Sequence, residues 1–177
     1  MEFTFETEYN QKAFTMMARA LRKTIRKKIS IRSHILGWVL VIACLILSVV
    51  YFSSYEGEMI AIRLENIITW IALLAVVLAL IFEDTLNGYL AKQRMLKGTE
   101  KTTAIFTWKN YTTTTAVGTT EWKYSTIHTI AETSNYFIII FSYNHAQLYD
   151  KRTMRGGTPE QFTRFLEQMT KKKMQSL

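Results

Sequence analysis

The residues that could perform acid–base or metal chemistry are few and scattered along this sequence. The histidines are His34, His128 and His145, and the only cysteine is Cys44. A single cysteine excludes an internal disulfide and a multi-cysteine zinc site. His128 and Glu132 are four residues apart, which in a strand separates them by about 13 Å along one face. The glycines form no phosphate-binding pattern. We therefore expect a non-enzymatic protein with no catalytic residues, no metal site and no cofactor.

Trp122 and Glu132 are a second pair that could belong to a site. A large aromatic ring is more often a core residue, and we interpret Trp122 in that way. A carboxylate near a strand end commonly pairs with a basic residue on a neighbouring strand. We therefore interpret Glu132 as a structural partner of Lys151 or Arg152.

The basic charge of the chain is concentrated in one segment. The net charge is +8, and residues 11–34 contain eight Lys and Arg residues and no acidic residue. Residues 53–66, in contrast, contain three Glu and one Arg. Basic and acidic segments that alternate around apolar ones are typical of a protein that lies at a membrane surface. We therefore expect no binding to nucleic acid.

Two apolar runs predict two membrane-spanning helices. Ile35–Phe52 covers about 27 Å as a helix and Ile67–Phe82 covers about 24 Å, close to the hydrocarbon thickness of a bilayer. A soluble domain of this size rarely needs two helices that are hydrophobic all round. The first run starts too far from the N-terminus and lacks the small residues of a signal-peptide cleavage site. We expect a two-helix transmembrane hairpin over residues 35–90, with spans at about 35–52 and 67–82.

The flanks of these runs predict the orientation of the hairpin. Basic residues precede the first run and follow the second, whereas the connecting loop is acidic. The positive-inside rule then places both termini in the cytoplasm and makes the chain a multi-pass protein of the cell membrane. The basic residues concerned are Lys27, Lys28, Arg32, Lys92, Arg94 and Lys97.

Residues 1–34 are expected to form an N-terminal arm with a basic amphipathic helix. Phe14, Met17, Leu21 and Ile25 recur at helical spacing among basic residues. This helix could lie on the inner leaflet, or it could continue into the first span and pack on the C-terminal domain. Alternatively, it could only mark the end of the span, with its lysines reaching the lipid headgroups. Attraction to anionic lipid is expected in each case. The candidate lipid-facing residues are Arg22, Lys23, Arg26, Lys27, Lys28 and Arg32.

Residues 99–177 change to the composition of short strands. Thr, Val, Ile and aromatic residues alternate with turn residues, and the run Tyr136–Ser142 predicts the most buried strand. A final helix is predicted from Thr158 as the N-cap, Pro159 at the first helical position and Gln161 in a capping box. The strands are expected at Thr102–Trp108, Tyr111–Ala116, Thr119–Glu132, Tyr136–Ser142 and Ala146–Tyr149.

The predicted fold class is a membrane α+β protein. It combines the hairpin and the basic N-terminal helix with a small β-barrel or sandwich, capped by the C-terminal helix, over residues 99–177. Five or six strands followed by one helix are the arrangement of pleckstrin-homology-like (PH-like) domains.

The order of these elements resembles the YcxB-like family of bacterial membrane proteins. Within residues 120–167, the strand opening Asn135-Tyr136-Phe137 and the helix from Pro159 also match that family. The family usually has proline where this chain has Asp150. The resemblance implies an architecture and no chemistry. Its signature residues here are Trp122, Ile127, Ile130, Glu132, Lys151 and Arg152.

We expect the β domain to bind a partner from its membrane anchor, either an unidentified protein or anionic lipid headgroups. PH-like domains commonly do so, which is an analogy of fold. The alternative is an immunity protein that protects the cell membrane against a secreted toxin or bacteriocin. Transport is disfavoured because the two runs contain no charge, unless the chain oligomerises, which the sequence leaves open.

Overall fold

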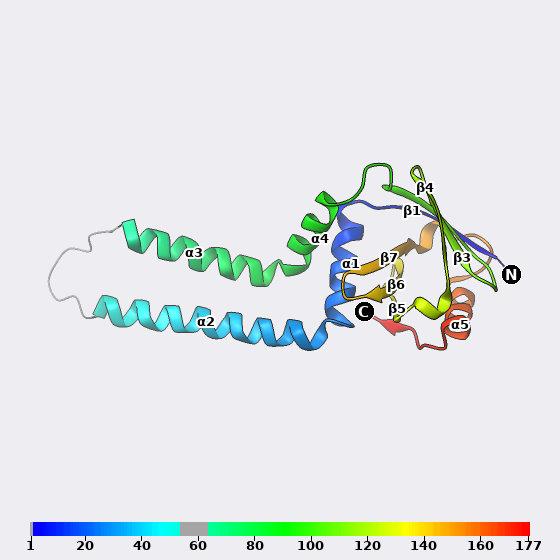
Figure 1. The fold of residues 1–177 in the computed structure, drawn as a ribbon. Helices are drawn as coiled ribbons and strands as arrows, with labels where there is room; N and C mark the ends of the chain where they lie inside the picture. Colours follow the sequence, from blue (N-terminus) through cyan, green and yellow to red (C-terminus); the bar gives the residue numbers. More distant parts are fainter. Residues whose placement is uncertain (1, 54–63) are drawn as a thin grey trace. The chain divides into compact units, whose positions relative to one another are not determined.

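The computed structural model describes residues 2–53 and 64–177, and within them the chain is an α+β protein with five α-helices and two four-stranded sheets (Figure 1). It divides into two compact units. One unit combines residues 1–27 with residues 84–177, and the other consists of residues 28–83. The expected division at 1–34, 35–90 and 99–177 therefore changes, because the N-terminal segment belongs to the same unit as the C-terminal strands.

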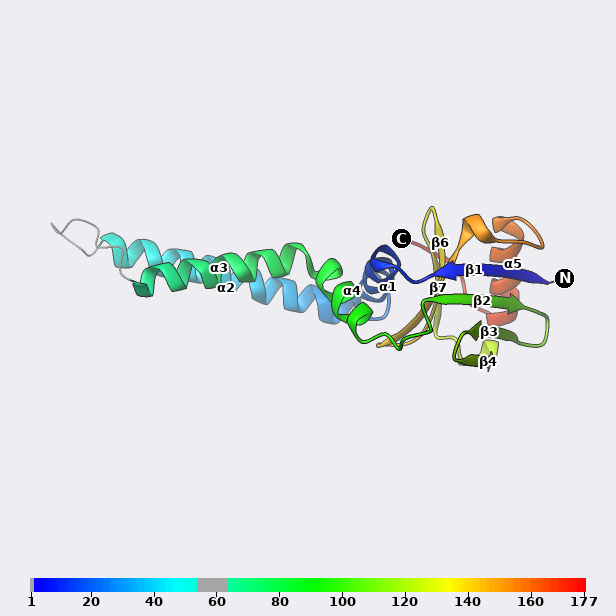
Figure 2. The ribbon, with the colours of Figure 1, turned by 90° about the horizontal axis from the view of Figure 1, so that it is seen from above.

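Two sheets form the framework of the first unit (Figures 1 and 2). The strand order is β1-β2-β3-β4 in one sheet and β7-β6-β5-β8 in the other. Neighbouring strands are antiparallel, except that β8 runs parallel to β5. The strands are β1 (Phe3–Glu8), β2 (Lys101–Phe106), β3 (Tyr111–Thr115), β4 (Gly118–Trp122), β5 (Thr129–Glu132), β6 (Tyr136–Ser142), β7 (His145–Asp150) and β8 (Gln175–Ser176).

Strand β1 comes from the segment that was expected to be a separate arm. It pairs with β2, so that Phe3 lies opposite Phe106 and Glu8 lies opposite Lys101. Phe3, Phe5 and Thr7 are buried, whereas Thr4 is half-buried and Glu6 and Glu8 are exposed. This period of two is the pattern of a half-buried strand. The unit that residues 99–177 were expected to form therefore requires the N-terminal residues as well.

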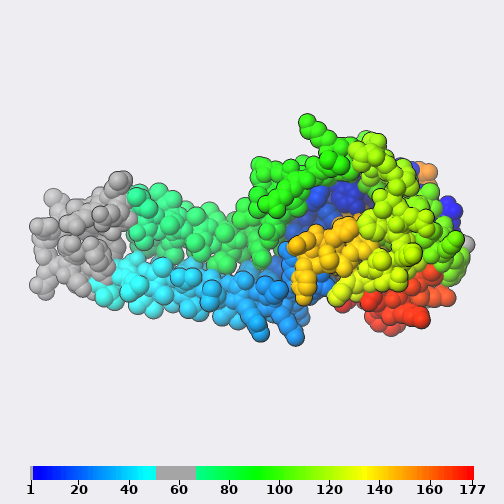
Figure 3. All heavy atoms as spheres, in the orientation of Figure 1, coloured from blue at the N-terminus to red at the C-terminus, as the bar shows by residue number. Residues whose placement is uncertain are grey.

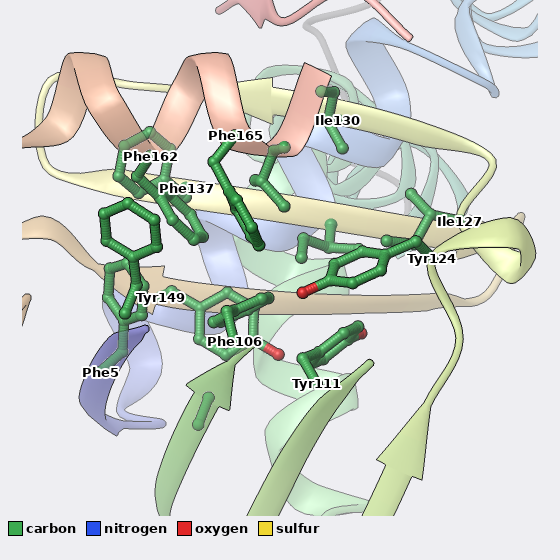
Figure 4. Packing of buried hydrophobic residues seen from close by; sticks show 14 residues of the cluster. Phe5, Phe106, Tyr111, Tyr124, Ile127, Ile130, Phe137, Tyr149, Phe162 and Phe165 are labelled. Carbon is green, nitrogen blue, oxygen red and sulfur yellow. The ribbon is translucent and has the colours of Figure 1, made fainter. Parts of the chain in front are cut away.

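Aromatic side chains fill the space between the two sheets (Figure 4). Helix α5 (Pro159–Thr170) contributes Phe162, whose ring centroid lies 4.7 Å from that of Phe5, 4.8 Å from that of Phe137 and 5.0 Å from that of Phe106. Edge-to-face and tilted contacts at these separations are favourable beyond the area they bury. One side chain of the C-terminal helix thus contacts strands β1, β2 and β6.

Helix α1 (Gln11–Lys23) covers the other face of the second sheet. Asn10 caps its first turn by accepting a hydrogen bond from the Ala13 amide. Its buried residues pack with Ile138 and Ile140 of β6, whose neighbours Phe137 and Ile139 face the aromatic core. Strand β6 is therefore buried on both faces, which confirms the prediction from its continuous apolar run. The buried residues of α1 are Ala13, Met17, Ala20 and Leu21.

The turns and the C-terminal helix follow the sequence closely. The predicted turn at Lys109-Asn110 lies between β2 and β3, and residues 143–144 separate β6 from β7. The predicted capping box is present, since Thr158 accepts from the Gln161 amide and the Gln161 side chain accepts from the Thr158 amide. Short 3-10 helices, η1 (Tyr124–Thr126) and η2 (Lys151–Thr153), precede β5 and follow β7.

The second unit contains helices α2 (Lys27–Ser53) and α3 (Leu64–Ile81), which lie side by side (Figures 1 and 2). Gly37 of α2 approaches α3 so closely that a Cβ there would lie 2.7 Å from a methyl carbon of Leu80. His34 Nε2 lies 2.6 Å from Glu83 Oε2. Glu56 and Glu58 of the expected outer loop lie outside the described residues.

One described helix, over Lys27–Val50, is long and apolar enough to cross a membrane. The second expected span is long and apolar enough only when Ile67–Ile81 and Glu83–Gln93 are taken together as one span with a bend between them. The latter segment is helix α4 (Glu83–Gln93), and from Asp84 onward it belongs to the first unit. Residues 84–90 were expected to be part of the hairpin, and buried contacts with α1 explain why they are not.

Candidate binding groove

Helices α1 and α4 are joined by the carboxylate of Asp84. Arg22 donates from Nε to Oδ1 at 2.6 Å and from Nη2 to Oδ2 at 2.7 Å, and Arg19 donates from Nε to Oδ2 at 3.3 Å. The Asp84 side chain is 11% exposed. Burial by itself would raise the pKa of Asp84, but the hydrogen bonds and positive charges of Arg22 and Arg19 outweigh it and lower the pKa below its usual value. Asp84 is thus a charged anchor for two arginines.

A glycine brings the backbones of these two helices together. A Cβ at Gly88 would lie 2.6 Å from the backbone nitrogen of Thr15 and 2.8 Å from its Cα. Real side chains do not approach a backbone this closely, so only glycine fits. Asp84 and Gly88 are four residues apart and so share one face of α4. That face determines how α4 packs against α1.

Arg26 connects the end of α1 to the turn between β6 and β7. Its Nε donates to the Tyr143 carbonyl oxygen at 2.7 Å, and its Nη2 donates to Asn144 Oδ1 at 2.5 Å. The turn, α1 and α4 therefore have fixed positions around one hollow.

This hollow is a groove of about 600 Å³. Figure 3 shows α1, in dark blue, between the green residues of α4 and the orange β6–β7 hairpin. Its walls combine apolar side chains with Asn87, Asn144 and His145, its two cations are Arg26 and Arg94, and no described carboxylate lines it. The lining residues are Phe14, Met17, Ala18, Leu21, Arg26, Asn87, Leu90, Ala91, Arg94, Asn144, His145 and Ala146.

A second hollow of about 380 Å³ shares Phe14, Met17, His145 and Ala146 with the groove. It extends toward β2 and β3, where Thr102 and Thr113 are among its lining residues. The two hollows are therefore continuous.

His145 stands where the two hollows meet. Its ring stacks on Phe141 at 4.7 Å and lies 5.4 Å from the ring of Trp122. Burial lowers the pKa of His145 below its usual value. The permanent positive charges of the groove are those of Arg26 and Arg94.

The expected lipid-facing residues fall into two groups. Arg22 bonds to Asp84 and Arg26 to the β6–β7 turn, so both guanidinium groups contact protein groups. The remaining side chains are exposed at the end of α1 and on the first turns of α2. They are Lys23, Lys27, Lys28 and Arg32.

The signature residues have structural roles and are not gathered into one site. Ile127 and Ile130 are core residues, and Trp122 packs at the edge of the core and donates from Nε1 to Thr113 Oγ1. The predicted partnership of Glu132 with Lys151 is confirmed at 2.7 Å. Arg152 bonds instead to Asp150, at 2.6 Å. Asp150 also accepts from the Arg152 amide and caps η2.

Several residues that line the groove were expected in other roles, namely in the amphipathic helix, at lipid or in the positive-inside bias: Phe14, Met17, Leu21, Arg26 and Arg94. Asp84, Asn87 and Gly88 had no predicted role. A signal was available, because an acidic residue and a glycine four apart after an apolar run share one helix face. Arg94 and His145 carry no signal of their own, since only the tertiary fold brings them together.

No family model, curated protein or solved structure matches this chain. In the described part of the chain, no group of three or more His, Cys, Asp and Glu side chains could hold a metal ion. The groove, with apolar walls and a basic rim, can bind a ligand that combines apolar and negatively charged parts.

Proposed function

We propose that this chain is a membrane-anchored, non-enzymatic binding protein. Residues 28–83 form a two-helix transmembrane hairpin, and the first unit is a PH-like module on the cytoplasmic side of a bacterial cell membrane. The module binds its ligand at the groove between α1, α4 and the β6–β7 turn.

The pairing of β1 with β2 carries this proposal. One strand precedes residues 28–83 and the other follows them, yet they form a continuous antiparallel ladder from Phe3–Phe106 to Glu8–Lys101. Paired strands must lie on the same side of a membrane. Any crossing made by α2 must therefore be reversed before β2, and α3 is the helix available to do so. An even number of crossings supports the hairpin over a single span.

The exposure of the two helices supports a lipid environment. Only 6% of the most apolar 18-residue stretch of α2 is buried within the protein. Large side chains such as Leu47, Val49 and Ile71 are more than 60% exposed. Contiguous apolar surface of this extent is rare on soluble monomers and marks contact with a membrane or a partner. Trp38 and Trp70 are also exposed on these helices, and aromatic rings favour the headgroup region.

The layout of the module supports the PH-like assignment and the YcxB-like resemblance. Two four-stranded sheets enclose one aromatic core, and α5 contributes three buried residues to it. The basic flanks Lys27, Lys28 and Arg32 favour the cytoplasmic side through the positive-inside rule.

The test is the accessibility of single cysteines in intact cells. In a Cys44→Ala background, Glu2→Cys, Glu58→Cys and Ser176→Cys are each treated with a membrane-impermeant maleimide. We expect labelling of Glu58→Cys in intact cells, and labelling of the two terminal positions only after lysis. Labelling of either terminus before lysis, or release of the chain by alkaline carbonate, would refute the proposal.

A further inference from the structure

We propose that the groove between α1, α4 and the β6–β7 turn binds a phospholipid with an anionic headgroup, and this inference rests on the membrane anchorage proposed above. The phosphate lies between Arg26 and Arg94, and the start of an acyl chain lies against the apolar walls. Phe14, Met17 and Leu90 are among the residues of those walls.

Both arginines have donors to offer. The Arg94 guanidinium makes no hydrogen bond or ion pair with any described residue, and the residue is exposed. Arg26 gives one donor to Tyr143 and one to Asn144. A guanidinium has five N–H groups, so Arg26 is held in position and still has donors for an anion. A fixed cation and an available one that line the same groove are suitable for binding a phosphate group.

The charge and shape of the groove favour a lipid over a free anion. No described carboxylate lines the groove, so an anion meets no repulsion there. Its volume of about 600 Å³ lies within the range of about 300–1,000 Å³ of small-molecule sites. Free phosphate would leave the half-buried ring of Phe14 and the exposed side chains of Leu90 and Ala91 in water, whereas an acyl chain would cover them.

The chain also keeps the groove near a supply of lipid. Leu21 precedes the start of α2 at Lys27 by six residues, and Asn87 follows the end of α3 at Ile81 by six residues. Six residues span at most about 22 Å when fully extended. A groove whose walls are joined this closely to both spans lies within reach of the headgroups.

The experiment measures lipid retention by the full-length protein in a non-ionic detergent, using native mass spectrometry. The probes are phosphatidylglycerol, phosphatidylcholine, inorganic phosphate and a hexaglutamate peptide. The variants are Arg94→Gln, which removes one cation, and Ala91→Trp, which fills the groove and keeps every charge. Lys97→Gln is the matched control, because Lys97 is an exposed cation close in sequence that does not line the groove.

We expect the wild type to retain phosphatidylglycerol over phosphatidylcholine. Arg94→Gln should weaken that binding about fivefold, as expected for one basic residue near a lipid surface. Ala91→Trp should weaken it at least as much, and Lys97→Gln should leave it within about twofold. Equal thermal stability of the four proteins shows that the variants are folded.

Several results would overturn the proposal. Equal loss in Arg94→Gln and Lys97→Gln would indicate diffuse attraction and no site. Competition by inorganic phosphate or hexaglutamate as strong as that by phosphatidylglycerol would assign the groove to a free anion or an acidic peptide. A protein that stays in membranes through carbonate washing but shows no preference for phosphatidylglycerol would refute this inference and leave the membrane anchorage intact.

Discussion

The carboxylate of Asp84 receives two hydrogen bonds from a single guanidinium group, that of Arg22, at 2.6 and 2.7 Å. Fork-to-fork pairing of this kind fixes orientation as well as distance. It ties α4, which follows the second apolar run, to α1, which precedes the first. The wall of the groove therefore depends on an ion pair between residues 62 positions apart.

Asp84→Asn should lower the free energy of unfolding of the first unit by about 2–3 kcal/mol, because the largely buried carboxylate that accepts from Arg22 and Arg19 would lose its charge. Arg19→Gln should cost less than about 1 kcal/mol, since Arg19 makes one longer bond and is 45% exposed. Urea denaturation followed by tryptophan fluorescence measures both values. Equal effects of the two substitutions would contradict a dominant role for Arg22.

The same pair predicts a loss of stability in acid. The pKa of Asp84 is lowered in the fold, so its contribution is fully present above the usual value of 3.8 and disappears as the pH falls through the folded pKa. The melting temperature of the wild type should therefore drop below about pH 4. Asp84→Asn should show a smaller drop over the same range, because the amide does not titrate. Parallel pH profiles of the two proteins would rule out this contribution.

Gly88→Ala should destabilise the contact between α1 and α4. Alanine stabilises a helix by about 1 kcal/mol relative to glycine. The new methyl group, however, would clash with the backbone of Thr15, which cannot move away as a flexible side chain could. Overpacking costs about 1–3 kcal/mol, so we expect a net loss in thermal unfolding and a larger loss for Gly88→Leu. Thr85→Ala, an exposed change in the same helix, is the control. A rise in the melting temperature of Gly88→Ala would contradict the contact.

The first strand can be tested by cross-linking. Glu8 and Lys101 are exposed partners, and the hydrogen bond from the Tyr9 amide to the Glu100 carbonyl makes theirs a non-hydrogen-bonded pair, in which side chains lie close. In a Cys44→Ala background, Glu8→Cys with Lys101→Cys should form a disulfide under mild oxidation. Cleavage between residues 54 and 63 should then leave two fragments joined until reduction.

The control for this cross-link is Glu8→Cys with Glu121→Cys. Glu121 lies on β4, which is separated from β1 by two strands, so no disulfide should form. Efficient oxidation of the control pair, or none of the first pair, would contradict the strand order.

The elements with local signals were predictable from the sequence. Strand β6 was found from its apolar run and α5 from its capping residues, because these signals lie within a few neighbouring residues. Strand β1 was not found, although its Phe–Thr–Phe alternation is visible, because its partner lies beyond both apolar runs. A lone six-residue segment has no pairing signal in its own sequence.

The groove was less predictable than the fold. Arg22 and Arg26 were expected to face lipid as members of a basic cluster, whereas the fold directs them to Asp84 and to the β6–β7 turn. A charge count contains no information on which partner a long side chain meets. The identification of Arg94 as a groove residue depends on tertiary packing that no spacing in the sequence encodes.

Strand β1 also imposes an order on synthesis. Its residues leave the ribosome before those of β2, and they have no strand partner until Lys101–Phe106 is translated, 93 residues after Glu8. At about 5–20 residues per second that interval is roughly 5–20 seconds, during which two buried phenylalanines stay accessible to chaperones and to other nascent chains. Glu6 and Glu8 place negative charges beside them, which discourages aggregation. Residues 28–83 are therefore translated before β1 can pair with β2.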